Sequence, residues 1–218
     1  APAAPASSSA PPAPEPTHVH LGAGRLGLGL VVNALTEDES RPLIILQQPS
    51  EAWEPVLRAG KASKRPLHEV RLSVNSEVLA TLVLVTCSRE LRMARRAADG
   101  SGKPLRVLAV SDDAGLVRDI AELASSVSCA LGPGLSEGVA NFVGAGVGAA
   151  SEDGESVVVY ACENDHGMVE ACARDMEGEA VDVVPVLVDR ICSGREIGGD
   201  YVRIEAEKYE GEIVVRMP

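Results

Sequence analysis

Short apolar segments bounded by turn-forming residues alternate with segments of helical periodicity along most of the chain. Several apolar runs, such as LIIL, LVLV and VVVY, are continuous, which is typical of strands covered on both faces. The predicted strands are 18–22, 43–47, 69–74, 82–86, 105–111, 157–162 and 181–188. The predicted helices are 25–35, 51–59, 89–98, 114–124 and 168–176. This alternation predicts an α/β fold with a Rossmann-like, doubly wound and mainly parallel sheet.

The two ends of the chain depart from this pattern. Residues 1–17, APAAPASSSAPPAPEPT, hold fifteen Ala, Pro or Ser residues and predict an extended arm that cannot form a core. We expect this arm to bind a protein partner, and residues 18–218 to form the dinucleotide-binding domain. The last segment, YVRIEAEKYEGEIVVRMP, alternates around Glu210 and Gly211 and predicts a C-terminal antiparallel hairpin at a sheet edge.

A glycine motif, GAGRLG, directly follows the first predicted strand and opens the first predicted helix. In a dinucleotide-binding turn, Gly22 would allow the tight turn, Gly24 would let a diphosphate approach the main chain, and Gly27 would let the helix pack on the strand. Arg25 and Leu26 would place their N–H groups at the positive end of the helix dipole. The alternative is a tight turn that no ligand visits.

The acid that usually follows the second strand of such a fold and binds the ribose is missing. Gln47 and Gln48 stand in that region, so nothing selects NAD through a carboxylate. Basic residues that would supply charge for NADP, or that only keep the surface soluble, are Arg25, Lys61, Lys64 and Arg65. NAD, NADP and lost binding all stay open.

Two further motifs carry a family resemblance. The first is ACEN, residues 161–164, which follows the strand VVVY. The second is VDRI, residues 188–191, which contains Asp189 and Arg190 and ends an apolar run. With the glycine motif, they make residues 18–215 resemble the N-terminal domain of the polyol-specific long-chain dehydrogenases, which include the mannitol-1-phosphate and mannitol dehydrogenases. The resemblance implies that Glu163 and Asn164 face a cofactor.

The same resemblance marks two departures from the family. Thr86 and Cys87 stand where the family has a loop of small residues that contacts the cofactor. The family's catalytic domain, with its lysine in a KxxxxNxxxH pattern, is expected after this region and is absent from this chain. Hydride transfer from a polyol needs a base within hydrogen-bond reach, so we nominate no catalytic residue.

Plainer interpretations exist for the polar residues of both motifs. Asn164 or Asp165 would cap the helix that follows, and His166 would be a solvated surface residue. Asp189 and Arg190 would form a structural ion pair, although the resemblance places them near the substrate cleft.

Composition and charge exclude several classes of function. A net charge of -12 repels a phosphate backbone, so nucleic-acid binding is not expected. The apolar stretches are too short and too often interrupted to span a bilayer. Five cysteines without CxxC spacing predict reduced, mostly core residues, no metal site, and a reducing compartment such as the cytoplasm or plastid stroma.

These observations favour a non-catalytic binding or scaffolding subunit of a larger assembly, built on an NAD(P)-binding domain. One alternative is the cofactor-binding part of a mannitol or mannitol-1-phosphate dehydrogenase. Another is a regulator that senses NAD(P)H.

Overall fold

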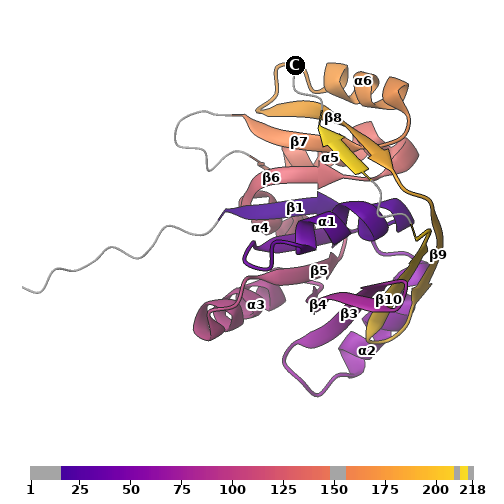
Figure 1. Cartoon of the computed structure of the whole chain (residues 1–218). Coiled ribbons are helices and arrows are strands. Elements are labelled where there is room, and N and C mark those ends of the chain that lie inside the picture. The colour runs from indigo at the N-terminus through magenta and orange to yellow at the C-terminus, as the bar shows by residue number, and fades with distance from the viewer. Residues whose placement is uncertain (1–15, 148–155, 209–211, 216–218) are drawn as a thin grey trace, which may run out of the picture.

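The computed structural model describes residues 16–147, 156–208 and 212–215 (Figure 1). Most of the predicted arm, and the predicted turn at Glu210 and Gly211, lie outside the described residues. None of the helices in the described part of the chain is both long and apolar enough to cross a membrane.

The described strands form one eleven-stranded sheet with the order β11-β8-β7-β6-β1-β2-β5-β4-β3-β10-β9. Their bounds are β1 Thr17–Leu21, β2 Leu43–Gln47, β3 His68–Val74, β4 Glu77–Val85, β5 Arg106–Val110, β6 Ala124–Cys129, β7 Val157–Cys162, β8 Val181–Asp189, β9 Cys192–Ile197, β10 Tyr201–Ala206 and β11 Glu212–Val215. All neighbours from β4 through β8 in this order are parallel. The chain turns from β1 to β2 on one side and places β6 on the other, which is the doubly wound arrangement predicted.

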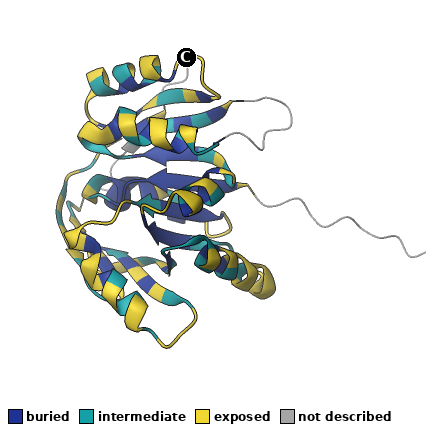
Figure 2. Cartoon of the chain, turned by 180° about the vertical axis from the view of Figure 1, so that it is seen from behind, coloured by how far each residue is buried: buried dark blue, intermediate teal, exposed yellow. Residues whose placement is uncertain are grey.

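Helices cover both faces of this sheet (Figure 1). Their bounds are η1 Gly27–Val31, α1 Val32–Thr36, η2 Glu51–Trp53, α2 Glu54–Ala62, α3 Ser88–Ser101, α4 Ala114–Ala121, η3 Gly132–Gly134, α5 Leu135–Gly144 and α6 His166–Asp175. One core joins the sheet to α3, α4, α5 and α6, and a second joins it to η1, α1, η2 and α2. Figure 2 shows the buried strands between these layers, with the exposed residues on the outer sides of the helices.

The C-terminal pairing differs from the predicted hairpin between residues 201–206 and 212–215. The hairpin that forms is β9 with β10, while β11 pairs antiparallel with β8 at the opposite edge of the sheet. The reason is the packing of the apolar side chains. Val202 and Ile204 of β10 enter the core around α1 and α2, whereas Ile213 of β11 packs against the separate cluster beside β8.

The strand β6 is absent from the sequence prediction, which extended a helix to residue 124. The helix ends at Ala121, and β6 follows directly as the neighbour of β1. Its sequence, ASSVSC, lacks the apolar run expected of a central strand because Ser126 and Ser128 bind two buried histidines of β1.

All five cysteines are free thiols, as predicted, and three of them are buried core residues. Burial is the main cause that raises the pKa of the Cys129 and Cys162 thiols, the latter to about 12. These thiols are therefore protonated at neutral pH.

Candidate functional site

The predicted site residues come together at one edge of the sheet. The glycine turn follows β1, Gln47 ends β2, Thr86 and Cys87 follow β4, and Glu163 follows β7. These strands are parallel, so their carboxyl ends share the edge at which open α/β sheets bind ligands. The turn after β1 lies at the point where the strand order reverses, between β1 and β6.

The three glycines of the turn differ in what surrounds them. A Cβ on Gly22, whose φ is +96°, would lie 2.6 Å from the carbonyl oxygen of Ala130. A Cβ on Gly27 would lie 2.6 Å from Nε2 of His20. A Cβ on Gly24 would meet only the Ala130 oxygen, at 3.9 Å. The protein's own packing therefore requires Gly22 and Gly27, while Gly24 faces open space.

Gln47 supports this turn from the end of β2. Its Oε1 accepts a hydrogen bond from the backbone N–H of Ala23 at 2.7 Å, and its Nε2 donates to the carbonyl of Gln48 at 2.7 Å. The side chain that replaces the expected acid thus fixes the position of the glycine turn.

Thr86 is held by the helix that follows it. Its N–H and its Oγ1 both donate to Oε2 of Glu90, at 2.7 and 3.0 Å, and its carbonyl accepts from Oγ of Ser111 at 3.0 Å. Cys87 follows as the half-buried residue before α3. The loop that small residues occupy in the resembled family is here fixed by side-chain hydrogen bonds.

Glu163 points into the protein and is only 6% exposed. Its Oε1 accepts hydrogen bonds from the N–H groups of Leu131 and Gly132, at 2.5 and 2.7 Å. It therefore anchors the segment between β6 and α5. Asn164 and His166 are exposed, and the cap of α6 is Asp165, whose Oδ1 accepts from the N–H of Met168 at 3.2 Å.

A segment that we call the strap, residues 190–195, leads from β8 into β9 and lies against the glycine turn. Arg195 donates through Nη1 to the carbonyl of Ala23 at 2.6 Å, and Arg25 donates through Nη1 to the carbonyl of Ser193 at 3.0 Å. Arg190 donates through Nη1 to the carbonyl of Gly29 at 2.7 Å. The predicted ion pair between Asp189 and Arg190 is wrong, because neither side chain takes part in an ion pair within the described residues.

Positive charge therefore gathers beside the turn. Partial burial and the nearby charge of Arg25 lower the pKa of Arg195. Among the described residues, Arg25, Arg190 and Arg195 have no carboxylate oxygen within 4.0 Å. Nε of Arg190 is buried and has no hydrogen-bond partner in the part of the chain that the structure describes.

Two histidines of β1 form a buried polar network under the turn. Both ring nitrogens of His18 lie 2.8 Å from serine hydroxyls, those of Ser126 and Ser128, and Nδ1 of His20 lies 2.7 Å from the Ser128 hydroxyl. Burial is the largest cause that lowers their pKa values, to about 4 for His18 and about 3 for His20, with Arg41 and His18 as further causes respectively. Both rings are neutral at physiological pH.

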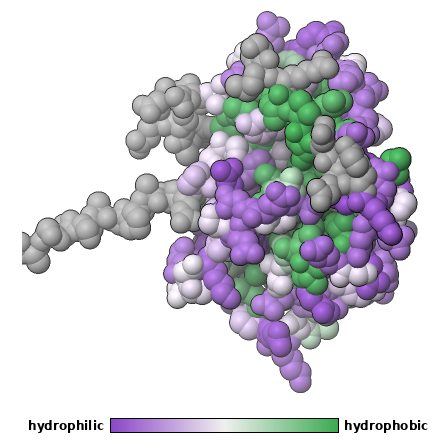
Figure 3. All heavy atoms as spheres, in the orientation of Figure 1, coloured by the Kyte–Doolittle hydropathy of each residue, from purple (hydrophilic) through white to green (hydrophobic). Residues whose placement is uncertain are grey.

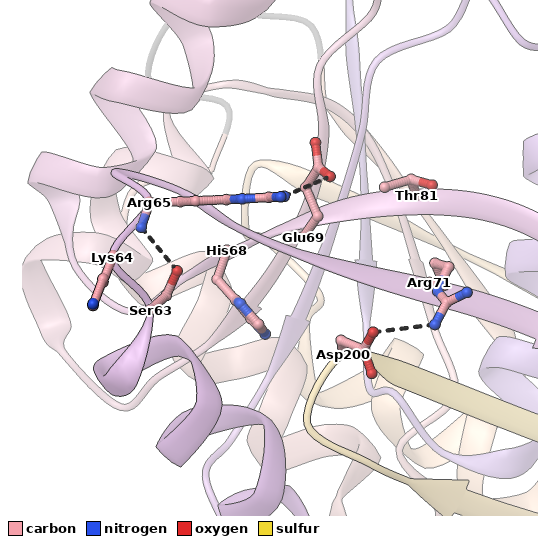
Figure 4. Close-up of a pocket in the computed structure, with 8 residues that line it drawn as sticks. All are labelled: Ser63, Lys64, Arg65, His68, Glu69, Arg71, Thr81 and Asp200. Carbon is pink, nitrogen blue, oxygen red and sulfur yellow. Dashed lines mark hydrogen bonds and ion pairs between the residues drawn. The ribbon is translucent and has the colours of Figure 1, made fainter.

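Two cavities lie next to β3 and β4, and no residue of the glycine turn lines either of them. The larger, about 440 Å³, is lined by Ser63, Lys64, Arg65, His68, Glu69, Arg71, Thr81 and Asp200 (Figure 4). Its arginines are paired, Arg65 with Glu69 at 3.9 Å and Arg71 with Asp200 at 3.1 Å. The smaller, about 250 Å³, brings Lys61 and Arg65 together with Thr86. The basic residues considered for NADP thus separate from Arg25.

No family model matches the sequence, and no curated protein matches it. The resemblance to the polyol dehydrogenases therefore stays a prediction from three motifs.

Sequence reasoning did not find Arg195, and it assigned Arg190 to a different contact. Their partners, Ala23 and Gly29, lie 172 and 161 residues away in the chain. The available signal was the close spacing of Arg190 and Arg195 in an acidic chain, but only the fold shows that they meet the glycine turn.

Proposed function

We propose that this chain is a binding subunit that holds a dinucleotide, NAD or NADP, at the carboxyl edge of its sheet. The observation that carries the proposal is the contrast within the glycine turn. Gly22 and Gly27 are required by neighbouring atoms, whereas Gly24 borders open space at the reversal of the strand order. A residue without a side chain at that point allows a diphosphate to approach the main chain.

The surrounding residues suit this ligand. The helical run from Arg25 to Thr36 begins at the turn, so its first N–H groups and the positive end of its dipole face the diphosphate position. The amide of Gln47 stands beside the ribose position and carries no charge. We therefore expect NADP to bind at least as well as NAD.

The proposal assigns binding and not hydride transfer. A base for a polyol hydroxyl must lie within hydrogen-bond reach of it and accept its proton. At this edge, the predicted Glu163 is buried and bound to two N–H groups, and Glu90, which the structure adds, is bound twice to Thr86. Both carboxylates are engaged in holding loops.

A role as a subunit of an assembly has support of its own. Ile191 is 68% exposed, and Leu187 of β8 and Val214 of β11 lie directly opposite each other with 39% and 43% exposure. Figure 3 shows hydrophobic surface over this end of the sheet. Exposed apolar residues at a sheet edge favour contact with another protein.

Thermal unfolding with NAD⁺, NADH, NADP⁺ and NADPH tests the binding proposal. A ligand at 100 times its dissociation constant stabilises the protein by about 2.7 kcal/mol. For a chain of this size, that is a shift in Tm of about 5 to 10 °C. Absence of a shift with all four dinucleotides at millimolar concentration contradicts the proposal. The assembly role is tested separately by the native mass in an extract, which a free monomer would contradict.

A further inference from the structure

We infer that Arg25 and Arg195, backed by Arg190, form a phosphate-binding site around Gly24 that takes the diphosphate group of a ligand. The inference rests on the proposed function for the identity of the ligand as a dinucleotide. It adds that side chains of the strap, and not only the main chain of the turn, hold the phosphates.

The first support is where the arginines attach. Both neighbours of Gly24 in the chain form a hydrogen bond with the strap. The carbonyl of Ala23 accepts from Arg195, and Arg25 donates to the carbonyl of Ser193. The two guanidinium groups thus come from different chain segments and meet at the residues on either side of Gly24.

The second support is the number of donors that remain. A guanidinium carries five N–H groups in a planar fork that matches two phosphate oxygens. Within the part of the chain that the structure describes, each of the three arginines gives one hydrogen bond, to a backbone carbonyl. Arg25 and Arg195 are exposed, so their other donors are accessible to a ligand.

The third support is electrostatic. Among the described residues, six arginines form ion pairs, as Arg203 does with Glu196 at 3.1 Å, whereas Arg25, Arg190 and Arg195 form none. Two acidic residues close to the strap, Glu205 and Glu207, make contacts with other groups. Oε1 of Glu207 accepts from the N–H of Ile191 at 2.7 Å, and the Glu205 carboxylate lies against Gly194. Three guanidinium groups together, without a carboxylate partner among the described residues, attract an anion.

The structure also provides a reporter. Trp53 is the single tryptophan, it is 1% exposed, and the guanidinium carbon of Arg195 lies 5.6 Å from its ring centroid. A phosphate bound to Arg195 brings negative charge beside this guanidinium and shifts its position, and therefore changes the emission of Trp53.

The test is a titration of the full chain with inorganic pyrophosphate, ADP-ribose and adenosine, followed by Trp53 fluorescence and calorimetry. We expect saturable binding of pyrophosphate and ADP-ribose, and none of adenosine at the same concentrations. Arg25→Gln and Arg195→Gln should each weaken both phosphate ligands about tenfold or more, since each removes a charge-assisted contact. Arg195→Lys, which keeps the charge, should recover part of the affinity.

Arg203→Gln is the matched control, because it removes one exposed arginine from the neighbouring strand β10 and should change binding less than about twofold. If dinucleotides bind but Arg25→Gln and Arg195→Gln behave like Arg203→Gln, the arginine site is wrong while the proposed function stands. If pyrophosphate binds through the arginines but no dinucleotide binds, the proposed function is wrong while the site stands. Failure of all three ligands and all four dinucleotides contradicts both.

Discussion

Arg25 and Arg195 each donate a hydrogen bond to the carbonyl two residues before the other: Arg25 to Ser193, and Arg195 to Ala23. This reciprocal contact joins the beginning of the domain to its last quarter. It explains how two like charges stay close together, because each guanidinium is stabilised by a backbone oxygen of the opposite segment. The turn and the strap therefore act as one structural unit.

The contrast between Gly24 and Gly27 gives two substitutions that should differ in their effect on stability. Gly27→Ala should lower the free energy of unfolding by about 1 to 3 kcal/mol, because its Cβ would lie 2.6 Å from Nε2 of His20. Gly24→Ala should change it by less than about 0.5 kcal/mol, since its Cβ meets only Ala130 at 3.9 Å. Gly24→Ala should still weaken dinucleotide binding. Urea unfolding and calorimetry measure the two quantities, and equal effects of the two variants on stability would contradict the described turn.

The buried histidines predict loss of stability in mild acid. Unfolded histidines take up protons below about pH 6.5, whereas His18 and His20 resist protonation until about pH 4 and 3. The unfolded state therefore binds more protons between pH 6.5 and 4.5, and the free energy of unfolding should fall by about 1.4 kcal/mol per pH unit for each histidine. It should be fully recovered above pH 7.

Urea unfolding across this pH range measures the slope. His20→Asn should remove about half of it. The exposed His166 provides the control, and His166→Asn should leave the slope unchanged. A slope that is the same in all three proteins would show that carboxylates, and not this network, set the acid sensitivity.

Glu163 predicts a stability effect at a position where the family resemblance implies cofactor contact. Glu163→Ala leaves the partly buried N–H groups of Leu131 and Gly132 without their acceptor, and should cost about 1 to 3 kcal/mol. Glu163→Gln keeps an oxygen acceptor and should cost less. Asn164→Ala, next to it and exposed, should have little effect in the same thermal unfolding experiment. A neutral Glu163→Ala would refute the anchoring role.

The sequence predicts most of the parallel sheet, because its strands are covered on both faces and read as continuous apolar runs. It does not predict β6, whose serines serve His18 and His20 from the adjacent strand. It also predicts a pairing of β10 with β11 that does not form, since local alternation cannot show that the two strands pack in different cores.

For the candidate site too, the sequence predicts the local features and misses the long-range contacts. The glycine turn and the residues at the strand ends are local signals, and they do reach one edge of the sheet. The contacts of Gln47 with Ala23 and of Glu163 with Leu131 depend on neighbouring strands, and those of Arg195 on the whole chain. Motif spacing holds no information on such contacts.

Gln47 predicts a change in cofactor preference. In Gln47→Glu, a carboxylate oxygen can still accept from the N–H of Ala23, and the new charge favours a ribose hydroxyl and repels a 2′-phosphate. The ratio of NAD to NADP affinity should rise about tenfold, equivalent to about 1.4 kcal/mol. Gln48→Glu adds the same charge one residue later, without the contact to Ala23, and should shift the ratio less. Calorimetry with both cofactors measures it, and an unchanged ratio in Gln47→Glu would place the ribose elsewhere.

The proposed binding of a diphosphate-bearing ligand on the glycine turn can be tested most directly by nuclear magnetic resonance. Amide resonances in ¹⁵N-labelled protein test it residue by residue during a titration with NADP⁺. We predict saturable shifts at Gly22, Gly24, Arg25, Leu26 and Gly27, and at Ser193 and Arg195 of the strap. No saturable shift at these residues, or shifts confined to the cavity around Arg71 and Asp200, would contradict it.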